Sequence, residues 1–253
     1  MKKMLIIAQT TLLELFRDRF FYVMFFVGIF VILLSLLFGA MSFDERNKMI
    51  VDFGYGAVQI SVLVLGLVLG SSIIAKEVER QTCLLILARP VSRWQFLMGK
   101  YFGILAVFFV NILVLNFVIL FLVGDWSKMI HSFVICLSLF LECSTVLSFV
   151  FLMSMFVRPV IAMLGGFSLF LIGHWLPDMQ YFAKKSQNVE FQAIADALMW
   201  VVPQFFQFNW KNYFFFLDDF KSSDVYLMTL HCVSWSSIAL LLATILFRRK
   251  DIV

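Results

Sequence analysis

Six long apolar runs constrain this chain more than any other feature of its sequence. Most of them are long enough to cross the roughly 30 Å hydrocarbon core of a bilayer as a helix. A helix satisfies its own backbone hydrogen bonds in lipid, and the alternating pattern of a membrane β-barrel does not appear. The sequence therefore predicts an all-α polytopic membrane protein with six transmembrane helices. The predicted spans are residues 21–41, 56–75, 101–123, 132–156, 160–175 and 227–247.

The overall composition supports the same class. The 253 residues are 62% hydrophobic and only 14% charged, whereas a soluble domain of this length carries far more charge. The net charge of +4 does not indicate nucleic-acid binding, because the basic residues flank the spans. Lys2 and Lys3 precede a short apolar patch, but Gln9 and Glu14 soon interrupt it. We therefore expect no signal peptide.

The distribution of Lys and Arg predicts the orientation of the spans. If the N-terminus is cytoplasmic, thirteen of the 20 basic residues fall on the cytoplasmic side and seven on the other. The positive-inside rule then places both termini in the cytoplasm. In this arrangement 1–253 is one membrane domain, and 176–226 is its largest outer loop. The fifth span is short and contains Gly165 and Gly166, which indicates a tilted, broken or tightly packed helix.

Residues 1–20 have their own helical pattern before the first span. Apolar residues recur at helical spacing, and polar residues lie mostly opposite them. This pattern favours an amphipathic helix along the cytoplasmic interface over a simple extension of the first span. The expected apolar face holds Leu5, Ala8, Leu12, Leu15 and Phe16, and the expected polar face holds Thr11, Glu14, Arg17 and Asp18.

The outer loop 176–226 also contains a helical pattern. Its mixed apolar and aromatic residues predict an interfacial or re-entrant helix around 191–202, which ends near Pro203. A set of aromatic residues suits the lipid headgroup region, namely Trp200, Trp210, Tyr213, Phe214, Phe215 and Phe216. They would serve either as simple anchors or as part of an external gate or substrate shelf.

The segment 76–100, KEVERQTCLLILARPVSRWQFLMGK, lies between the second and third spans. Charged residues open it, 82–88 is apolar, and Pro90 breaks the helix because a residue before proline is pushed out of the α region. Ser92 and Gln95 have the spacing of a capping box and restart a helix. The pattern predicts a helix–break–helix hairpin on the cytoplasmic side. From the residues alone, this hairpin is either a docking element or a loop that satisfies topology.

A resemblance distinguishes these two readings. E-x-E-R-x-T, then P-V-S-R and then G-K between spans two and three are similar to the cytoplasmic signature of ABC-2-type permeases, the membrane subunits of ABC exporters. The helix before the first span, the six-span plan, the long last outer loop and the ending LFRRKDIV also resemble this family. Gln81 departs from it, since many relatives have glycine there. The matching residues are Glu77, Glu79, Arg80, Thr82, Pro90, Val91, Ser92, Arg93, Gly99 and Lys100.

The resemblance implies that the hairpin is a coupling element that docks into a groove of a cytoplasmic ABC ATPase subunit. Dimerisation of two ATPase subunits on ATP would change the access of a path between two permease halves. The resemblance also implies export, a second permease copy or a paired permease, and the bacterial cytoplasmic (inner) membrane. The implied roles are polar docking for Glu77, Glu79 and Arg80, fixing of the break for Pro90 and Ser92, and anchorage at the interface for Arg93 and Lys100.

The chain has no G-x-x-x-x-G-K-[ST] motif for binding a nucleotide. Gly99 and Lys100 are followed by Tyr101, and Trp94 stands where the first glycine would be. The motif needs that glycine and a hydroxyl side chain to hold phosphates and Mg²⁺. We therefore expect no enzyme activity and no cofactor in this chain, with ATP and Mg²⁺ bound by the separate ATPase subunit.

Glu142 lies inside the predicted fourth span, where a carboxyl group is costly and is a candidate functional group. It could bind a substrate cation, relay a proton or line the transport path. It could equally be a hydrogen-bonded packing residue beside Ser144 or Thr145. The alternative to an ATP-driven permease is an ion-coupled carrier or a membrane assembly factor that uses Glu142. Such a carrier needs several paired ionisable residues at mid-membrane, and the sequence places only Glu142 there.

Other polar residues are more typical of structural roles. We expect Gln59, Asn111 and Asn116 to form hydrogen bonds between helices. The three histidines are far apart and form no H-E-x-x-H motif, which argues against a metalloprotease. The four cysteines form no CxxC pair, so neither a disulfide framework nor a zinc site is indicated.

Overall fold

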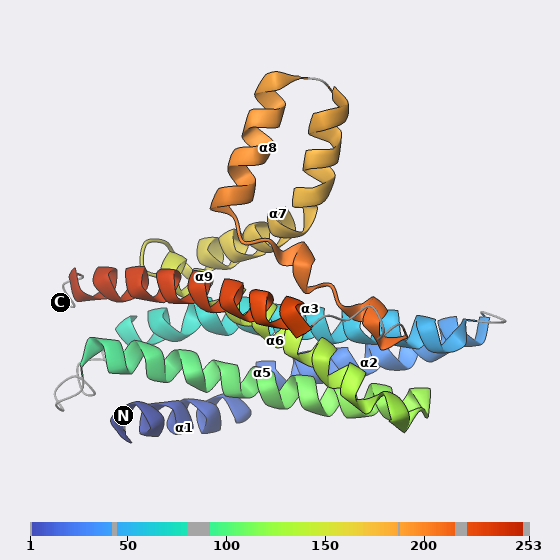
Figure 1. The fold of residues 1–253 in the computed structure, drawn as a ribbon. Helices are drawn as coiled ribbons and strands as arrows, with labels where there is room; N and C mark the ends of the chain where they lie inside the picture. The colour runs from blue at the N-terminus through green and yellow to red at the C-terminus, as the bar shows by residue number, and fades with distance from the viewer. Residues whose placement is uncertain (1, 42–44, 80–91, 187, 216–221, 250–253) are drawn as a thin grey trace.

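A computed structural model describes residues 2–41, 45–79, 92–186, 188–215 and 222–249 as an all-helical bundle (Figure 1). Six described helices are long and apolar enough to cross a membrane, in agreement with the six predicted spans. The described α-helices are α1 (Lys2–Phe16), α2 (Arg19–Met41), α3 (Arg46–Glu79), α5 (Arg93–Val123), α6 (Met129–Ser154), α7 (Pro159–Ser186), α8 (Val189–Val201) and α9 (Ser222–Arg249). Short 3₁₀ helices lie between some of them, namely η1 (Trp126–Lys128), η2 (Phe205–Phe208) and η3 (Lys211–Phe214).

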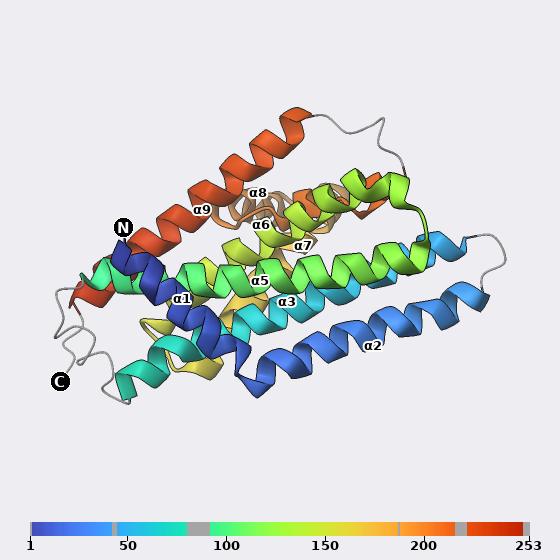
Figure 2. The ribbon, with the colours of Figure 1, turned by 90° about the horizontal axis from the view of Figure 1, so that it is seen from below.

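Helices α3 and α6 form the centre of the bundle. α3 packs against α2, α5, α6 and α7, while α6 packs against α3, α5, α7 and α9. Both central helices are mostly buried, whereas α2 and α7 leave most of their surface exposed. The start of α1 and the end of α9 lie at the same end of the bundle (Figures 1 and 2). Such an arrangement is required if both termini are on one side of a membrane.

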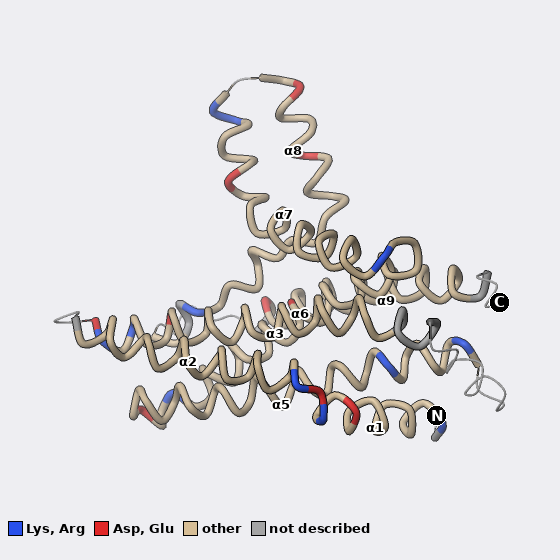
Figure 3. Tube along the Cα trace, turned by 180° about the vertical axis from the view of Figure 1, so that it is seen from behind, with Lys and Arg blue, Asp and Glu red and all other residues tan. Residues whose placement is uncertain are grey.

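Several helices extend beyond the predicted spans. α3 begins at Arg46 rather than at residue 56, and α5 begins at Arg93 rather than at residue 101. Apolar runs mark only the part of a helix that suits lipid, so they do not predict its charged ends. Figure 3 shows charged residues mainly toward the ends of the bundle and on the hairpin of α7 and α8, with few in the middle. This distribution is typical of a membrane bundle.

Helix α7 is much longer than the predicted fifth span. It runs from Pro159 to Ser186 and contains Pro177. Its second half leaves the bundle and pairs with α8, so that the two helices form a hairpin that stands away from the other helices (Figure 1). A proline inside a helix removes a hydrogen bond and bends the axis, so Pro177 accounts for the change of direction. In the first half, Gly166 packs closely against Val150, as the predicted tight packing requires.

Helix α8 confirms the helix predicted around 191–202. Its N-cap residue Asn188 accepts hydrogen bonds from the backbone N–H groups of Glu190 and Phe191, at 2.9 and 3.3 Å. Trp200 is 86% exposed, as an anchor in the headgroup region requires. The same prediction is wrong for Trp210 and Phe214. Both are buried, because η2 and η3 pack back onto the bundle.

Helix α1 is separate from α2 and packs along α5. It is therefore not an extension of the first span. Thr11 was expected on the polar face but is fully buried. Its hydroxyl is satisfied there because it donates to the carbonyl oxygen of Ile7 at 2.8 Å. Leu5 was expected on the packed face but is 56% exposed. The prediction holds for Leu12, Leu15 and Phe16, which lie in or against the core, and it is wrong for Leu5 and Thr11.

Candidate functional site

The start of α5 has the predicted capping box. Ser92 is the N-cap, and its hydroxyl accepts from the backbone N–H of Gln95 at 3.3 Å. The Gln95 side-chain oxygen accepts from the Ser92 N–H at the same distance. These bonds satisfy backbone donors at the helix end. The segment 80–91 before Ser92 lies outside the described residues, and with it Arg80, Thr82, Pro90 and Val91.

Arg93 connects the start of α5 to the end of α9. Its Nη1 donates to the carbonyl oxygen of Phe247 at 2.8 Å. Its guanidinium carbon lies 5.9 Å from the centre of the Phe247 ring, and that ring stacks on Phe96 at 6.2 Å. The bond satisfies a carbonyl in the last turn of α9 that has no partner within the helix. The third and sixth spans are thereby joined at one end of the bundle.

Gly99 and Lys100 lie against α1. Lys100 is 5% exposed, and its Nζ lies 3.5 Å from Oε2 of Glu14. A Cβ atom at Gly99, or at Gly103 one turn later, would lie 2.7 Å from a side-chain carbon of α1. The two glycines therefore allow α1 to approach α5 closely, as small residues do at helix interfaces in membranes.

We call the contacts of Ser92, Arg93, Gly99, Gly103 and Lys100 the α5-start contacts. They connect α1, α5 and α9 directly after segment 80–91. The backbone of Glu77 and Glu79 belongs to the end of α3, while their side chains lie outside the described part of the chain. Four of the predicted coupling residues thus occupy one end of α5, and three of these contact another helix.

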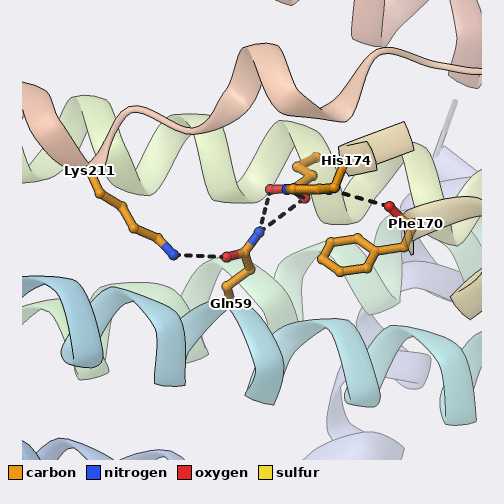
Figure 4. Close-up of polar contacts among 5 residues, drawn as sticks. Gln59, Phe170, His174 and Lys211 are labelled. Carbon is orange, nitrogen blue, oxygen red and sulfur yellow. Dashed lines mark hydrogen bonds and ion pairs between the residues drawn. The ribbon is translucent and has the colours of Figure 1, made fainter. Parts of the chain in front are cut away.

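Glu142 is 1% exposed and belongs to a polar cluster that joins three spans and η3 (Figure 4). Gln59 of α3 donates through Nε2 to both carboxylate oxygens of Glu142, at 3.1 and 3.0 Å. Nε2 of His174, from α7, lies 3.4 Å from Oε1 of Glu142. Lys211 of η3 donates through Nζ to Oε1 of Gln59 at 3.1 Å. We call these four residues the Glu142 cluster.

The Glu142 cluster supplies partners for a carboxylate away from water. An uncompensated charge in such a place is costly. Here an amide and an imidazole contact the carboxylate, and the ammonium group of Lys211 bonds to that amide. Burial lowers the pKa of Lys211, while the negative charges of Glu142 and Asp52 oppose this shift. The arrangement is therefore suited to hold or exchange a proton or another cation.

The sequence predicts Glu142 as the one ionisable residue at mid-membrane. In a packing role, it would form hydrogen bonds beside Ser144 or Thr145. Both hydroxyls instead donate to a backbone carbonyl of their own helix. The actual partners are distant in the sequence, and only the fold brings them together. Gln59 was the one available signal, because an amide inside an apolar span needs a partner. Its predicted role in bonding between helices is confirmed.

The two asparagines of the third span also bond between helices, as predicted. Asn111 donates to the hydroxyl of Ser61 at 3.3 Å. Asn116 accepts from the hydroxyl of Tyr55 at 2.9 Å and donates to Ser132 at 3.4 Å. The cysteines that the structure describes, Cys136, Cys143 and Cys232, are buried.

The comparison with protein families decides the class to which this bundle belongs. A family model described as "ABC-2 family transporter protein" matches residues 7–252. The chain belongs to the ABC-2 transporter family. The match covers nearly the whole chain and confirms the resemblance drawn from the segment 76–100. ABC-2 membrane subunits lack ATPase activity and work with an ATPase partner. A search of curated proteins found no match to this ABC-2 subunit.

Proposed function

We propose that this ABC-2 subunit is the permease half of an ATP-driven exporter in the bacterial cytoplasmic membrane, with both termini in the cytoplasm. A separate ATPase subunit docks on 76–100, and two permease subunits, identical or paired, enclose the path. The ATPase dimer favours one permease state because it binds the two states with different affinity. Glu142 lies beside this path.

The anchorage of α5 directly after segment 80–91 is the observation that carries this proposal. Ser92 fixes where the helix begins, Arg93 holds the end of α9, and Lys100 pairs with α1. A force applied to 80–91 therefore acts on three helices at once. Such a connection suits a segment that transmits movement better than one that only links two spans.

The proposal divides the predicted coupling residues into two groups. Those before the break make the docking surface, and those after it pass the movement into the bundle. The docking group is Glu77, Glu79, Arg80 and Thr82, with Pro90 and Ser92 at the break, and the transmitting group is Arg93, Gly99 and Lys100.

A pull-down from the native membrane tests this function. Tagged full-length protein is extracted gently, its partners are identified by mass spectrometry, and ATPase activity is measured. We expect an ATPase with a Walker motif, which is lost in Glu79→Lys. Glu190→Lys is the matched control, because it makes the same charge change at an exposed residue of α8. Arg93→Ala should keep the ATPase bound but uncouple its hydrolysis from transport.

The Glu142 cluster is the observation that favours the alternative, an ion-coupled carrier or a membrane assembly factor. Paired ionisable groups inside a bundle are what an ion-coupled carrier needs. Recovery of folded, full-length protein without an ATPase would favour this alternative. Retention of the ATPase by Glu79→Lys would contradict the docking role of 76–100.

A further inference from the structure

Hydrogen-bond geometry fixes one hydrogen on the ring of His174. Its Nδ1 lies 3.3 Å from the carbonyl oxygen of Phe170, one turn earlier in α7. A carbonyl oxygen only accepts, so Nδ1 donates in this contact. The opposite nitrogen, Nε2, carries a hydrogen as well only when the ring is charged. The gap between Nε2 and Oε1 of Glu142 therefore has room for one proton, which either partner can hold.

The lengths of the contacts suit the state without that proton. The 3.4 Å between Nε2 and Oε1 exceeds the typical length, about 2.7–2.9 Å, of a hydrogen bond between charged partners. Gln59 donates to both oxygens of Glu142, as it can to an ionised carboxylate. With Glu142 ionised, His174 neutral and Lys211 charged, the four residues have no net charge. A neutral cluster is the least costly one to bury.

Lys211 reaches this cluster from outside the spans. It belongs to the segment 202–214, which crosses the bundle near the cluster. Gly173, the residue before His174, allows the Phe205 ring and the carbonyl of Pro203 to lie directly on α7. The segment is thus seated on the spans both by packing and by the bond from Lys211 to Gln59.

Withdrawal of Lys211 would leave Glu142 with only a neutral amide and a neutral imidazole. The cluster would regain neutrality by taking up a proton, which Glu142 and His174 would share. We propose that Glu142 and His174 form a proton-binding site that holds its proton more tightly when Lys211 is withdrawn, so that release of the segment 202–214 is coupled to uptake of a proton. This inference goes beyond the transport function proposed above and concerns this chain alone.

The other titratable groups near the site can be separated from it by mutation. Asp52 of α3 acts on Lys211 through its charge, and Cys143 of α6 follows Glu142 directly. His231 of α9 accepts a hydrogen bond from the backbone N–H of Gln204 at 3.2 Å. Protonation of His231 would also weaken the hold on 202–214, so this histidine needs its own control.

Distance measurements between two spin labels test the proposal in full-length protein in lipid nanodiscs. One label is placed at Asn209, an exposed residue between η2 and η3, and the other at Ile130, 72% exposed near the start of α6. The background carries Cys83→Ser, since the other cysteines are buried. As the pH falls, the ratio of released to seated segment should rise by up to about tenfold per pH unit, because one proton is exchanged.

Variants identify the group that binds the proton. Glu142→Gln and Lys211→Met should each abolish the pH dependence. The first variant removes the carboxylate that takes up the proton, and the second removes the positive charge that the proton replaces. His231→Gln should retain it. The proposal is overturned if the wild-type distances do not change with pH, if the change survives in Glu142→Gln or Lys211→Met, or if it disappears in His231→Gln. Lys211→Met replaces a residue of the 202–214 segment and so carries the test if Glu142→Gln fails to fold. The result does not depend on whether an ATPase docks on 76–100.

Discussion

Replacing Gly103 by alanine should loosen α1 from α5. A Cβ atom at this position would lie 2.7 and 2.8 Å from the Cβ and Cγ2 atoms of Thr11, and 3.1 Å from the carbonyl oxygen of Ala8. The Thr11 side chain is β-branched and its hydroxyl is bonded to the Ile7 carbonyl, so it has little freedom to turn away. Helix α1 must therefore shift as a whole. Overpacking of this kind costs about 1–3 kcal/mol.

Hydrogen exchange of the α1 backbone amides in the purified full-length protein measures this cost. A loss of local stability of about 1–3 kcal/mol should lower the α1 protection factors by about 5- to 150-fold. Gly165→Ala is the matched control, because it makes the same change where the nearest atom is 3.9 Å away. Unchanged α1 protection in Gly103→Ala, or an equal loss in Gly165→Ala, would refute the close-packing argument.

Arg93→Met should speed hydrogen exchange in the last turn of α9, because the carbonyl of Phe247 loses a charged donor, and Arg93→Lys should restore part of the protection. Ser92→Ala should lower the stability of the first turn of α5 by about 0.5–2 kcal/mol, and Ser92→Asp should recover it in the same measurement. Asp125, before η1, accepts hydrogen bonds from the hydroxyl and the backbone N–H of Ser127, which lower its pKa from the ordinary value of 3.8. A pKa lowered by folding stabilises the folded state fully above the unfolded value, and the effect is lost as the pH falls through the lowered value. Exchange in η1 should therefore rise only in strong acid, and Asp125→Asn should remove this dependence.

The sequence was sufficient for the spans because lipid imposes a length and an apolar composition on each of them. It was also sufficient for the helix start at Ser92, which is set by local capping, and for the helix around 191–202, which has its own apolar and aromatic pattern. Helix faces were harder to predict. Thr11 has a polar side chain, yet a hydroxyl that bonds to a carbonyl of its own helix can be buried against a second helix. Trp210 and Phe214 are aromatic in an outer loop, and composition does not distinguish a headgroup anchor from a buried contact.

A different reason explains why the sequence does not predict the partners of Glu142. Which polar groups meet depends on which helices are neighbours, and α3, α6 and α7 are neighbours only in the folded bundle. Lys211 lies in the predicted outer loop 176–226. Its contact with Gln59 depends on a loop that turns back onto the spans. The candidate residue could therefore be named from sequence, but its chemistry could not.

The bond between Arg93 and Phe247 has a consequence for how the chain is made. These residues are 154 positions apart, whereas Lys100 and Glu14 are 86 apart. A ribosome delivers the chain from its N-terminus, so α1 can meet α5 once the third span has emerged. Arg93 can bond to the Phe247 carbonyl only after the last turn of α9 has been made. A chain truncated before Phe247 could insert its earlier spans yet never form this bond, so the connection between α5 and α9 forms only after α9 has been made.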